Sequence, residues 1–295
     1  MSSATPILTP QLLTQLERLE LVSRKIYRGQ MKGERRSPRK GQSVEFADFR
    51  NYVAGDDLRF IDWNCYARLD KLFLKLFLEE EDLHFYALID ASRSMGFGDP
   101  TKLDYAKQLA AALGFVGLAR ADRVRIETLG QSSSTRSPVF RGRRSLWRMQ
   151  QYLEGIEPSE QPPLAEGVRN FCLRNSGKGI LVLISDMMHK EGYESALRYL
   201  VSQQMDVYVV QVLSREEIEP ELQGDLRLVD CEDGDVAEIT ASAPLLARYH
   251  DTLNAFVGGV RDFCTRRGMS HVLAANDVPV DRMVANYLRK QGLVR

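Results

Sequence analysis

Two apolar segments of the chain each end in an aspartate, about one hundred residues apart. The first reads LIDASRSM from Leu88 to Met95, and the second reads ILVLISD from Ile180 to Asp186. Each pattern is typical of a buried strand that runs out into a loop. Because the carboxyl ends of parallel strands converge on one crevice of an open α/β sheet, Asp90 and Asp186 are expected at the same edge.

The chain after residue 83 alternates between strand and helix patterns. Strands are expected at 84–90, 124–129, 139–141, 179–185, 207–213 and 270–274. Helices are expected at 102–120, 145–153, 164–174, 193–203, 244–267 and 282–291. The predicted fold class is therefore α/β, with a doubly wound, mostly parallel sheet covered by helices on both faces. A small β-hairpin insertion is expected where residues 225–231 and 236–240 flank an Asp-Gly turn.

The first 82 residues follow a different pattern. Leucines near helical spacing predict a helix over 10–29, and the polar, Gly- and Pro-containing stretch 30–42 predicts a loop. Residues 43–82 form an α/β prelude that ends in an extended run at 72–78. We therefore expect an N-terminal part at 1–82, packed on a sheet domain at 83–295.

Composition excludes several classes of protein. Lys+Arg and Asp+Glu both total 40, and this zero net charge argues against nucleic acid as the main partner. The four cysteines form no CxxC pair, which argues against a structural zinc site and favours free thiols in a reducing compartment. No run of 18 apolar residues is present, so we expect no membrane span and a cytoplasmic protein.

The loop after the first strand carries oxygen ligands at alternate positions. Asp90, Ser92 and Ser94 can aim three oxygens at one point, and Asp186 adds a second carboxylate from the neighbouring strand end. Oxygen ligands of this type, with no histidine or cysteine beside them, suit a hard cation such as Mg²⁺ or Mn²⁺. The alternative is a hydrogen-bonded loop in which Asp90 and the serines cap the next helix.

This order resembles the von Willebrand factor A domain and its metal-ion-dependent adhesion site, over residues 83–291. In that family the serines bind the metal directly, the aspartates bind it directly or through water, and an open position takes an acidic residue of a partner. The resemblance assigns these roles to Asp90, Ser92, Ser94 and Asp186. Pro163 stands where the family has a threonine ligand, so Ser159, Gln161 or water would have to replace it.

A second group of charged residues lies in the prelude. Asp56, Arg59 and Asp62 are three residues apart, so in a helix they would stack as alternating charges on one face. Arg68 adds a cation, and Trp63 an apolar anchor. Two interpretations stay open, namely an ion-pair network that fixes the prelude to the sheet domain and a partner-binding surface.

The prelude and the strand-end motif together resemble the bacterial family called domain of unknown function 58. The match consists of GDDLRFIDW at 55–63, Ala-Arg at 67–68, the approach GQSVEFADFRNY at 41–52, and the Asp-x-Ser-x-Ser-Met loop, within a resemblance over most of 20–292. Members are often encoded beside MoxR-type AAA+ ATPases and are suspected of helping them mature or assemble other proteins. The resemblance implies a chaperone-like binding adaptor of the short type without membrane helices.

The favoured function is thus a non-catalytic protein–protein interaction module that depends on a divalent cation and acts with a MoxR-type ATPase. The basic segment 24–40, with eight basic residues and one acid, would attract an acidic surface. One alternative is a metal-dependent phosphoester hydrolase, although His189, the only histidine near the site, is expected on an exposed loop. The other alternative is a nucleic-acid-binding protein that uses the segment 24–40.

Overall fold

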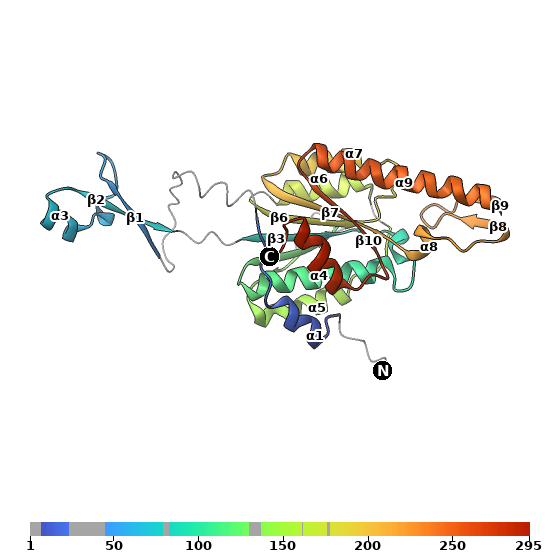
Figure 1. Ribbon diagram of the computed structural model, residues 1–295, viewed down its shortest axis with the longest axis horizontal. Helices are drawn as coiled ribbons and strands as arrows, with labels where there is room; N and C mark the ends of the chain where they lie inside the picture. The colour runs from blue at the N-terminus through green and yellow to red at the C-terminus, as the bar shows by residue number, and fades with distance from the viewer. Residues whose placement is uncertain (1–6, 24–44, 79–82, 130–136, 161, 176–177) are drawn as a thin grey trace. The chain divides into compact units, whose positions relative to one another are not determined.

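The computed structural model describes residues 7–23, 45–78, 83–129, 137–160, 162–175 and 178–295. The chain divides into two compact units, one made of residues 1–31 with 83–295 and the other of residues 32–82 (Figure 1). The N-terminal helix thus groups with the large unit. The basic segment 24–40 and the loop predicted at 30–42 lie outside the described residues.

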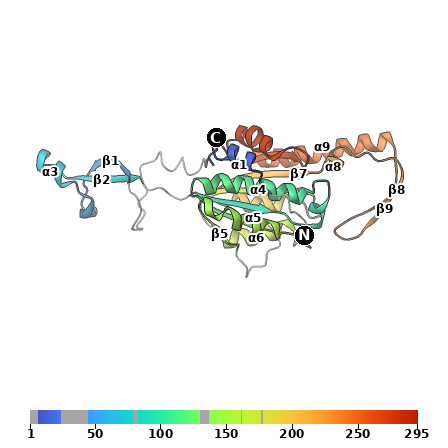
Figure 2. The same ribbon diagram turned by 90° about the horizontal axis from the view of Figure 1, so that it is seen from below.

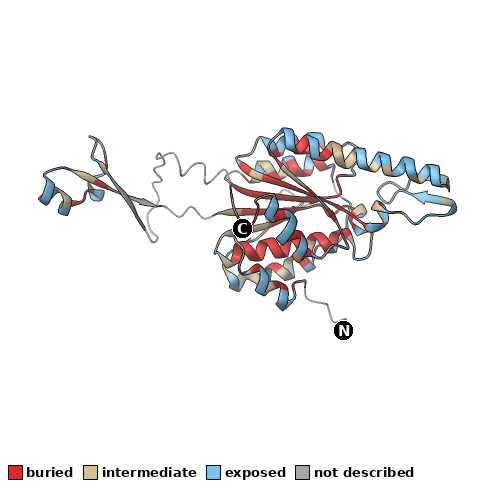
Figure 3. Ribbon diagram, viewed as in Figure 1, coloured by how far each residue is buried: buried red, intermediate tan, exposed pale blue. Residues whose placement is uncertain are grey.

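A six-stranded sheet forms the centre of the large unit, in the order β10-β7-β6-β3-β4-β5. All neighbouring strands are parallel except β4 and β5. The strands are β3 (His84–Ile89), β4 (Arg123–Thr128), β5 (Val139–Phe140), β6 (Gly179–Ser185), β7 (Met205–Leu213) and β10 (Ser270–Ala275). Every residue of β6 is buried, as its unbroken apolar sequence requires in a sheet covered on both faces (Figure 3). The predicted α/β class with a mostly parallel sheet is confirmed.

Helices cover the two faces of this sheet (Figures 1 and 2). One face carries α1 (Pro10–Leu16), α4 (Lys102–Ala119), α5 (Leu146–Glu154) and the C-terminal helical segment of α10 (Val280–Arg282) and η4 (Met283–Leu288). The other face carries α6 (Leu164–Arg174), α7 (Glu194–Val201) and α9 (Ala243–Arg266). Side chains of β3 alternate between these two cores, with Phe85 and Ile89 in the first and Tyr86 and Leu88 in the second.

The N-terminal helix is shorter than predicted, since α1 ends at Leu16 and not at residue 29. The chain then pairs with the C-terminus, because Leu21 forms an antiparallel bridge with Val294 and the Val22 N–H donates to the Leu293 carbonyl at 2.8 Å. Leucines at helical spacing continue beyond α1 to Leu21. Leu21 is buried, but it lies in the segment that pairs with the C-terminus and not in a helix.

The predicted hairpin is present as β8 (Gly224–Val229) and β9 (Val236–Ala241), paired antiparallel. Both strands are largely exposed, and the N-terminal half of α9 beside them is exposed as well (Figure 3). The loop between the two strands, residues 230–235, is the part of this insertion that approaches the sheet domain, as described below.

The small unit pairs β1 (Glu45–Asn51) with β2 (Phe73–Leu78) antiparallel. Between them lie the single turn η1 (Leu58–Phe60) and the helix α3 (Trp63–Leu69). Ile61 makes an isolated bridge to Leu74, and both side chains are buried within the unit. The run predicted as extended at 72–78 is therefore a strand.

His271 on β10 gives the large unit an expected pH dependence. Burial lowers the pKa of His271 to about 4, and the charge of Arg261 acts in the same direction. Between pH 6.5 and pH 4, His271 is protonated in the unfolded chain but stays neutral in the native chain. The free energy of unfolding therefore falls as the pH drops over this interval. We expect this loss to reach up to about 3 kcal/mol.

Urea denaturation of wild type and His271→Asn at pH 7 and pH 4.5 measures this contribution. We expect the variant to lose less stability over this interval than wild type. An equal loss in the two proteins would show that His271 titrates normally in the native state.

Candidate functional site

The loop after β3 folds back on its first residue. Asp90 directly follows the strand, is fully buried, and continues the sheet by donating its N–H to the Ile184 carbonyl at 2.9 Å. Its Oδ1 accepts the Ser92 N–H at 2.9 Å, which turns the chain toward the short helix η2 (Arg93–Gly96). The Ser92 and Ser94 hydroxyl oxygens lie 3.0 Å apart. The two serine hydroxyls thus lie side by side in the loop that begins with Asp90 at the carboxyl end of β3.

The second oxygen of Asp90 has two partners from the loop after β6. Oδ2 accepts the Ser185 hydroxyl at 2.6 Å and lies 2.9 Å from His189 Nε2. Burial opposes ionisation of Asp90, but the contacts with His189 and Ser185 outweigh it, so the pKa of Asp90 is below its ordinary value. Burial also opposes protonation of His189, but Asp90 outweighs it and raises the pKa of the imidazole. His189 is partly buried in this pair, and its predicted exposed position is wrong.

Asp186 lies at the same edge but is paired with a buried lysine. Its Oδ1 accepts the Met188 N–H at 2.9 Å, and its Oδ2 accepts from Lys102 Nζ at 2.8 Å. Lys102 also donates to Glu217 Oε1 at 2.6 Å. Burial lowers the pKa of Lys102, but the Asp186 and Glu217 carboxylates outweigh it and raise the pKa above its usual value.

Sequence reasoning missed both Lys102 and Glu217. A usable signal was present, because Lys102 is the first residue of a mostly apolar helix, where the helix dipole disfavours a cation. A buried lysine in that position needs carboxylate partners, and Asp186 supplies one. Glu217 also closes a capping box with Ser214 at the start of α8 (Arg215–Ile218), which fixes its carboxylate beside the ammonium group.

Two carboxylates and an imidazole come together beside the Asp90 loop. A carboxylate oxygen of Asp90, one of Asp186 and a ring nitrogen of His189 lie within 4.8 Å of one another. Pro163 stands at the N-cap of α6 and supplies no side-chain hydrogen bond. Of its predicted substitutes, Gln161 lies outside the described residues, and Ser159 binds the Asp90 loop by donating its N–H to the Ala91 carbonyl at 2.8 Å.

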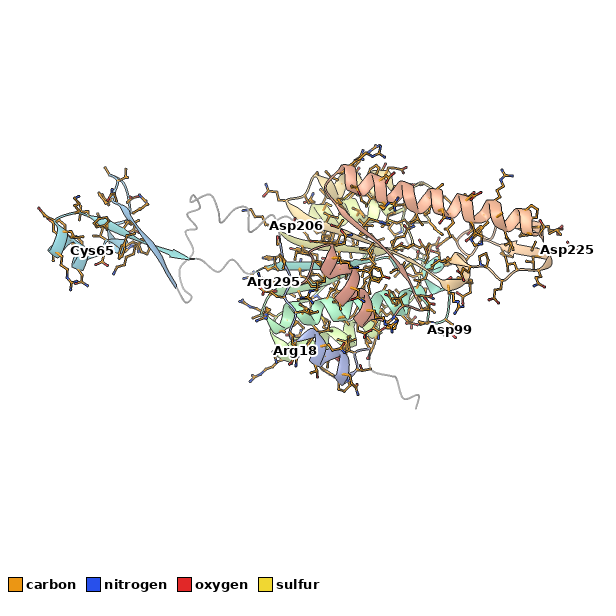
Figure 4. The ribbon with its side chains drawn as sticks, viewed as in Figure 1. Arg18, Cys65, Asp99, Asp206, Asp225 and Arg295 are labelled. Carbon is orange, nitrogen blue, oxygen red and sulfur yellow. The ribbon has the colours of Figure 1, made fainter. Side chains whose placement is uncertain are left out.

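The loop of the β8–β9 hairpin reaches this site from far along the chain. Glu232 Oε1 accepts the Ser94 N–H at 2.9 Å. In Figure 4, Asp99 follows the Asp90 loop and Asp225 lies at the start of β8, and both are toward one end of the large unit. Asp206, where β7 begins, lies at the opposite end. Because it accepts the Ser94 N–H, Glu232 is an acidic group that the structure adds to the site and that the sequence did not identify.

The charged residues of the small unit form separate pairs. Asp56 accepts from Arg50 at 2.7 Å, and Arg59 is paired with Asp57 at 2.5 Å. Asp62 is paired with Lys75 at 3.1 Å. The predicted stack of Asp56, Arg59 and Asp62 on one helical face does not form.

The backbone explains this difference. Ile61 is extended, with ψ of 135°, and interrupts the helical path between η1 and α3. Asp62 instead caps α3, because its Oδ1 accepts the Asn64 and Cys65 N–H groups. Trp63 and Arg68 are exposed on α3, and Trp63 makes an edge-to-face contact with Tyr66 at 6.2 Å between ring centroids.

We expect Asp62→Ala to lower the melting temperature of the small unit more than Arg59→Ala does. Asp62 caps a helix and pairs with Lys75, whereas the Arg59–Asp57 pair is exposed to solvent. Thermal unfolding followed by circular dichroism compares the two variants. Equal melting temperatures in both would contradict the assigned role of Asp62.

A family model described as "Protein of unknown function DUF58" matches residues 48–255. The chain belongs to this family. The DUF58 match spans both groups of residues described above, from Asp56 to Arg68 and from Asp90 to Glu232. Within the described part of the chain, no helix combines the length and apolar character needed to cross a membrane.

Relatives of the chain include two uncharacterized mycobacterial proteins, Rv1480 of Mycobacterium tuberculosis and Mb1516 of Mycobacterium bovis. Each is 27% identical over 244 residues, which cover 80% of this chain and 76% of the relative.

Two solved structures are also similar. The conserved hypothetical protein BatB from Bacteroides thetaiotaomicron has a TM-score of 0.46 at 16% identity, over 71% of this chain and 98% of that one. An aerotolerance-related membrane protein from Bacteroides fragilis has a TM-score of 0.44 at 18% identity, over 70% and 99% of the two chains.

Proposed function

We propose that the chain is a non-catalytic protein-recognition module whose Asp90 loop binds an acidic group of a partner with the help of a divalent cation. The observation that supports this proposal is the tightly turned loop at the carboxyl edge, in which Asp90 accepts the Ser92 N–H and the Ser92 and Ser94 hydroxyl oxygens lie 3.0 Å apart. Open α/β sheets bind their ligands at this edge. A von Willebrand factor A type of fold is part of the same proposal.

Asp90, Ser92 and Ser94 would hold Mg²⁺ or Mn²⁺, since carboxylate and hydroxyl oxygens are suitable ligands for these ions. Asp186 shares its Oδ2 with Lys102, so we assign it a supporting role in binding water beside the cation. When bound, the cation would supply a positive centre for a partner's carboxylate.

A MoxR-type AAA+ ATPase is the partner that we propose, in the maturation or assembly of other proteins. This part of the proposal comes from the family resemblance of the Gly55–Trp63 motif and the Asp90 loop. The exposed side chains of Trp63 and Arg68 make α3 a second surface for such a partner.

A metal-dependent phosphoester hydrolase is the second candidate, because His189 lies 2.9 Å from Asp90 and could move a proton. The same contact also explains how the loop is held, and it uses the Asp90 oxygen that already accepts from Ser185. We expect no turnover of p-nitrophenyl phosphate with Mg²⁺ or Mn²⁺. Turnover that disappears in His189→Gln would favour the hydrolase.

A thermal-shift titration with Mg²⁺, Mn²⁺ and Ca²⁺ tests the cation. A ligand that binds only the native state stabilises it, by about 2.7 kcal/mol when its concentration is one hundred times its Kd. The melting temperature therefore rises with the concentration of the ligand. We expect this rise in wild type and its loss in Asp90→Asn, with His250→Asn as the control. No rise in any of the three proteins would remove the cation from the proposed function.

A further inference from the structure

The acidic loop of the β8–β9 hairpin, residues 230–235, contacts the candidate site at two points. The first is the hydrogen bond in which Glu232 Oε1 accepts the Ser94 N–H at 2.9 Å, across 138 residues of sequence. Ser94 is one of the residues proposed to recognise a partner, so an acidic side chain of the chain itself contacts the recognition loop. Glu232 is also among the charges that raise the pKa of His189.

The second contact is made by Lys190, next to His189 in the loop after β6. Its ammonium group donates to Asp233 and lies 3.4 Å from an oxygen of Asp230 and of Asp235. Lys190 thus contacts three carboxylates of one hairpin loop. These ion pairs are exposed to solvent, and such pairs are weak and sensitive to salt.

The hairpin loop is held in shape by its own hydrogen bonds. The Gly234 N–H donates to the Asp230 carbonyl, and the Glu232 N–H donates to Asp230 Oδ1 at 2.8 Å. The strands on either side are largely exposed. The insertion therefore presents Glu232 as a preformed acidic group whose hold on the sheet domain rests on exposed contacts.

We propose that Glu232 is an internal competitor of the partner. Its carboxylate accepts the Ser94 N–H until a carboxylate from an acidic segment of the partner displaces it. The partner segment would carry one carboxylate for Ser94 and a second for Lys190, as the hairpin loop does. This inference rests on the proposed function for the identity of the site, but the competition itself requires only Ser94, Lys190 and the hairpin.

The test uses the full chain and a synthetic peptide with the sequence of residues 228–237, in which serine replaces Cys231. If Glu232 blocks the Ser94 N–H in most molecules, its removal raises the apparent affinity of the peptide for this group by the inverse of the unblocked fraction. We expect Glu232→Ala to bind the peptide at least about fivefold more tightly than wild type. Asp225→Asn changes a carboxylate at the other end of the hairpin, bonded to Thr240, and should bind like wild type.

Hydrogen exchange of the 92–97 segment provides an independent readout, because Glu232→Ala should speed exchange of the Ser94 amide whether or not a partner binds. Equal peptide affinity in wild type, Glu232→Ala and Asp225→Asn would overturn the proposed competition. It would also be overturned if Glu232→Ala speeds exchange of the Ser94 amide but does not bind the peptide. Tighter binding by Glu232→Ala without any cation-induced thermal shift keeps the competitor and removes the cation from the proposed function. The failures of the two proposals are thereby distinguishable.

Discussion

Replacing Lys102 by methionine is expected to lower the free energy of unfolding by about 3–5 kcal/mol. Lys102 has no solvent exposure and donates to Asp186 at 2.8 Å and to Glu217 at 2.6 Å. Methionine fills a similar volume but leaves Asp186, which is 1% exposed, without its counter-charge. Urea denaturation at pH 7 measures the loss.

Lys290→Met, which changes an exposed lysine in the C-terminal region, is the matched control and should have little effect. The double variant Lys102→Met/Asp186→Asn should recover part of the stability, since both members of the buried pair are then neutral. A loss in Lys102→Met no larger than that of the control would contradict the assigned role of the buried ammonium group.

Asp90→Ala is expected to lower the free energy of unfolding by about 2–4 kcal/mol, because it leaves three buried or half-buried groups without an acceptor. These groups are the Ser185 hydroxyl, the His189 ring and the Ser92 N–H. We therefore expect Asp90→Ala to weaken the fold as well as partner binding.

Two matched substitutions separate stability from recognition at this loop. Ser94→Ala removes a hydroxyl but keeps the backbone N–H that Glu232 accepts, and it should cost little stability. Asp90→Asn keeps the side-chain volume and removes the charge, so it should fall between wild type and Asp90→Ala in urea denaturation. Equal stability of Asp90→Ala and wild type would show that the three hydrogen bonds contribute nothing to the native state.

Local patterns carried most of the fold prediction. Continuous apolar strands between helices predicted the parallel sheet, and the rule that strand ends converge placed Asp90 and Asp186 at one edge. The hairpin followed from its Asp-Gly turn. Each of these signals depends on neighbouring residues, whose preferences the sequence displays directly.

The partners of the two aspartates were not predicted, because they come from distant parts of the chain and local patterns do not pair them. Lys102 lies 84 residues from Asp186, and His189 lies 99 residues from Asp90. In the small unit, the three-residue spacing failed because Ile61 is extended and breaks the helix that the spacing assumes. The leucine spacing near the N-terminus also predicted too long a helix. Residues 20–22 instead pair with residues 293–295, and this pairing depends on the far end of the chain.

Recognition by the Asp90 loop is the central claim, and binding of a MoxR-type AAA+ ATPase to the full chain tests it most directly. The affinity is measured by biolayer interferometry at one Mg²⁺ concentration, because the ATPase itself uses Mg²⁺ with its nucleotide. Wild type is compared with Ser92→Ala/Ser94→Ala, and with Ser202→Ala on the distant end of α7 as the control. We expect the affinity to fall about tenfold or more, which corresponds to about 1.4 kcal/mol, in the double variant alone. Equal affinity in all three proteins would contradict recognition by the Asp90 loop.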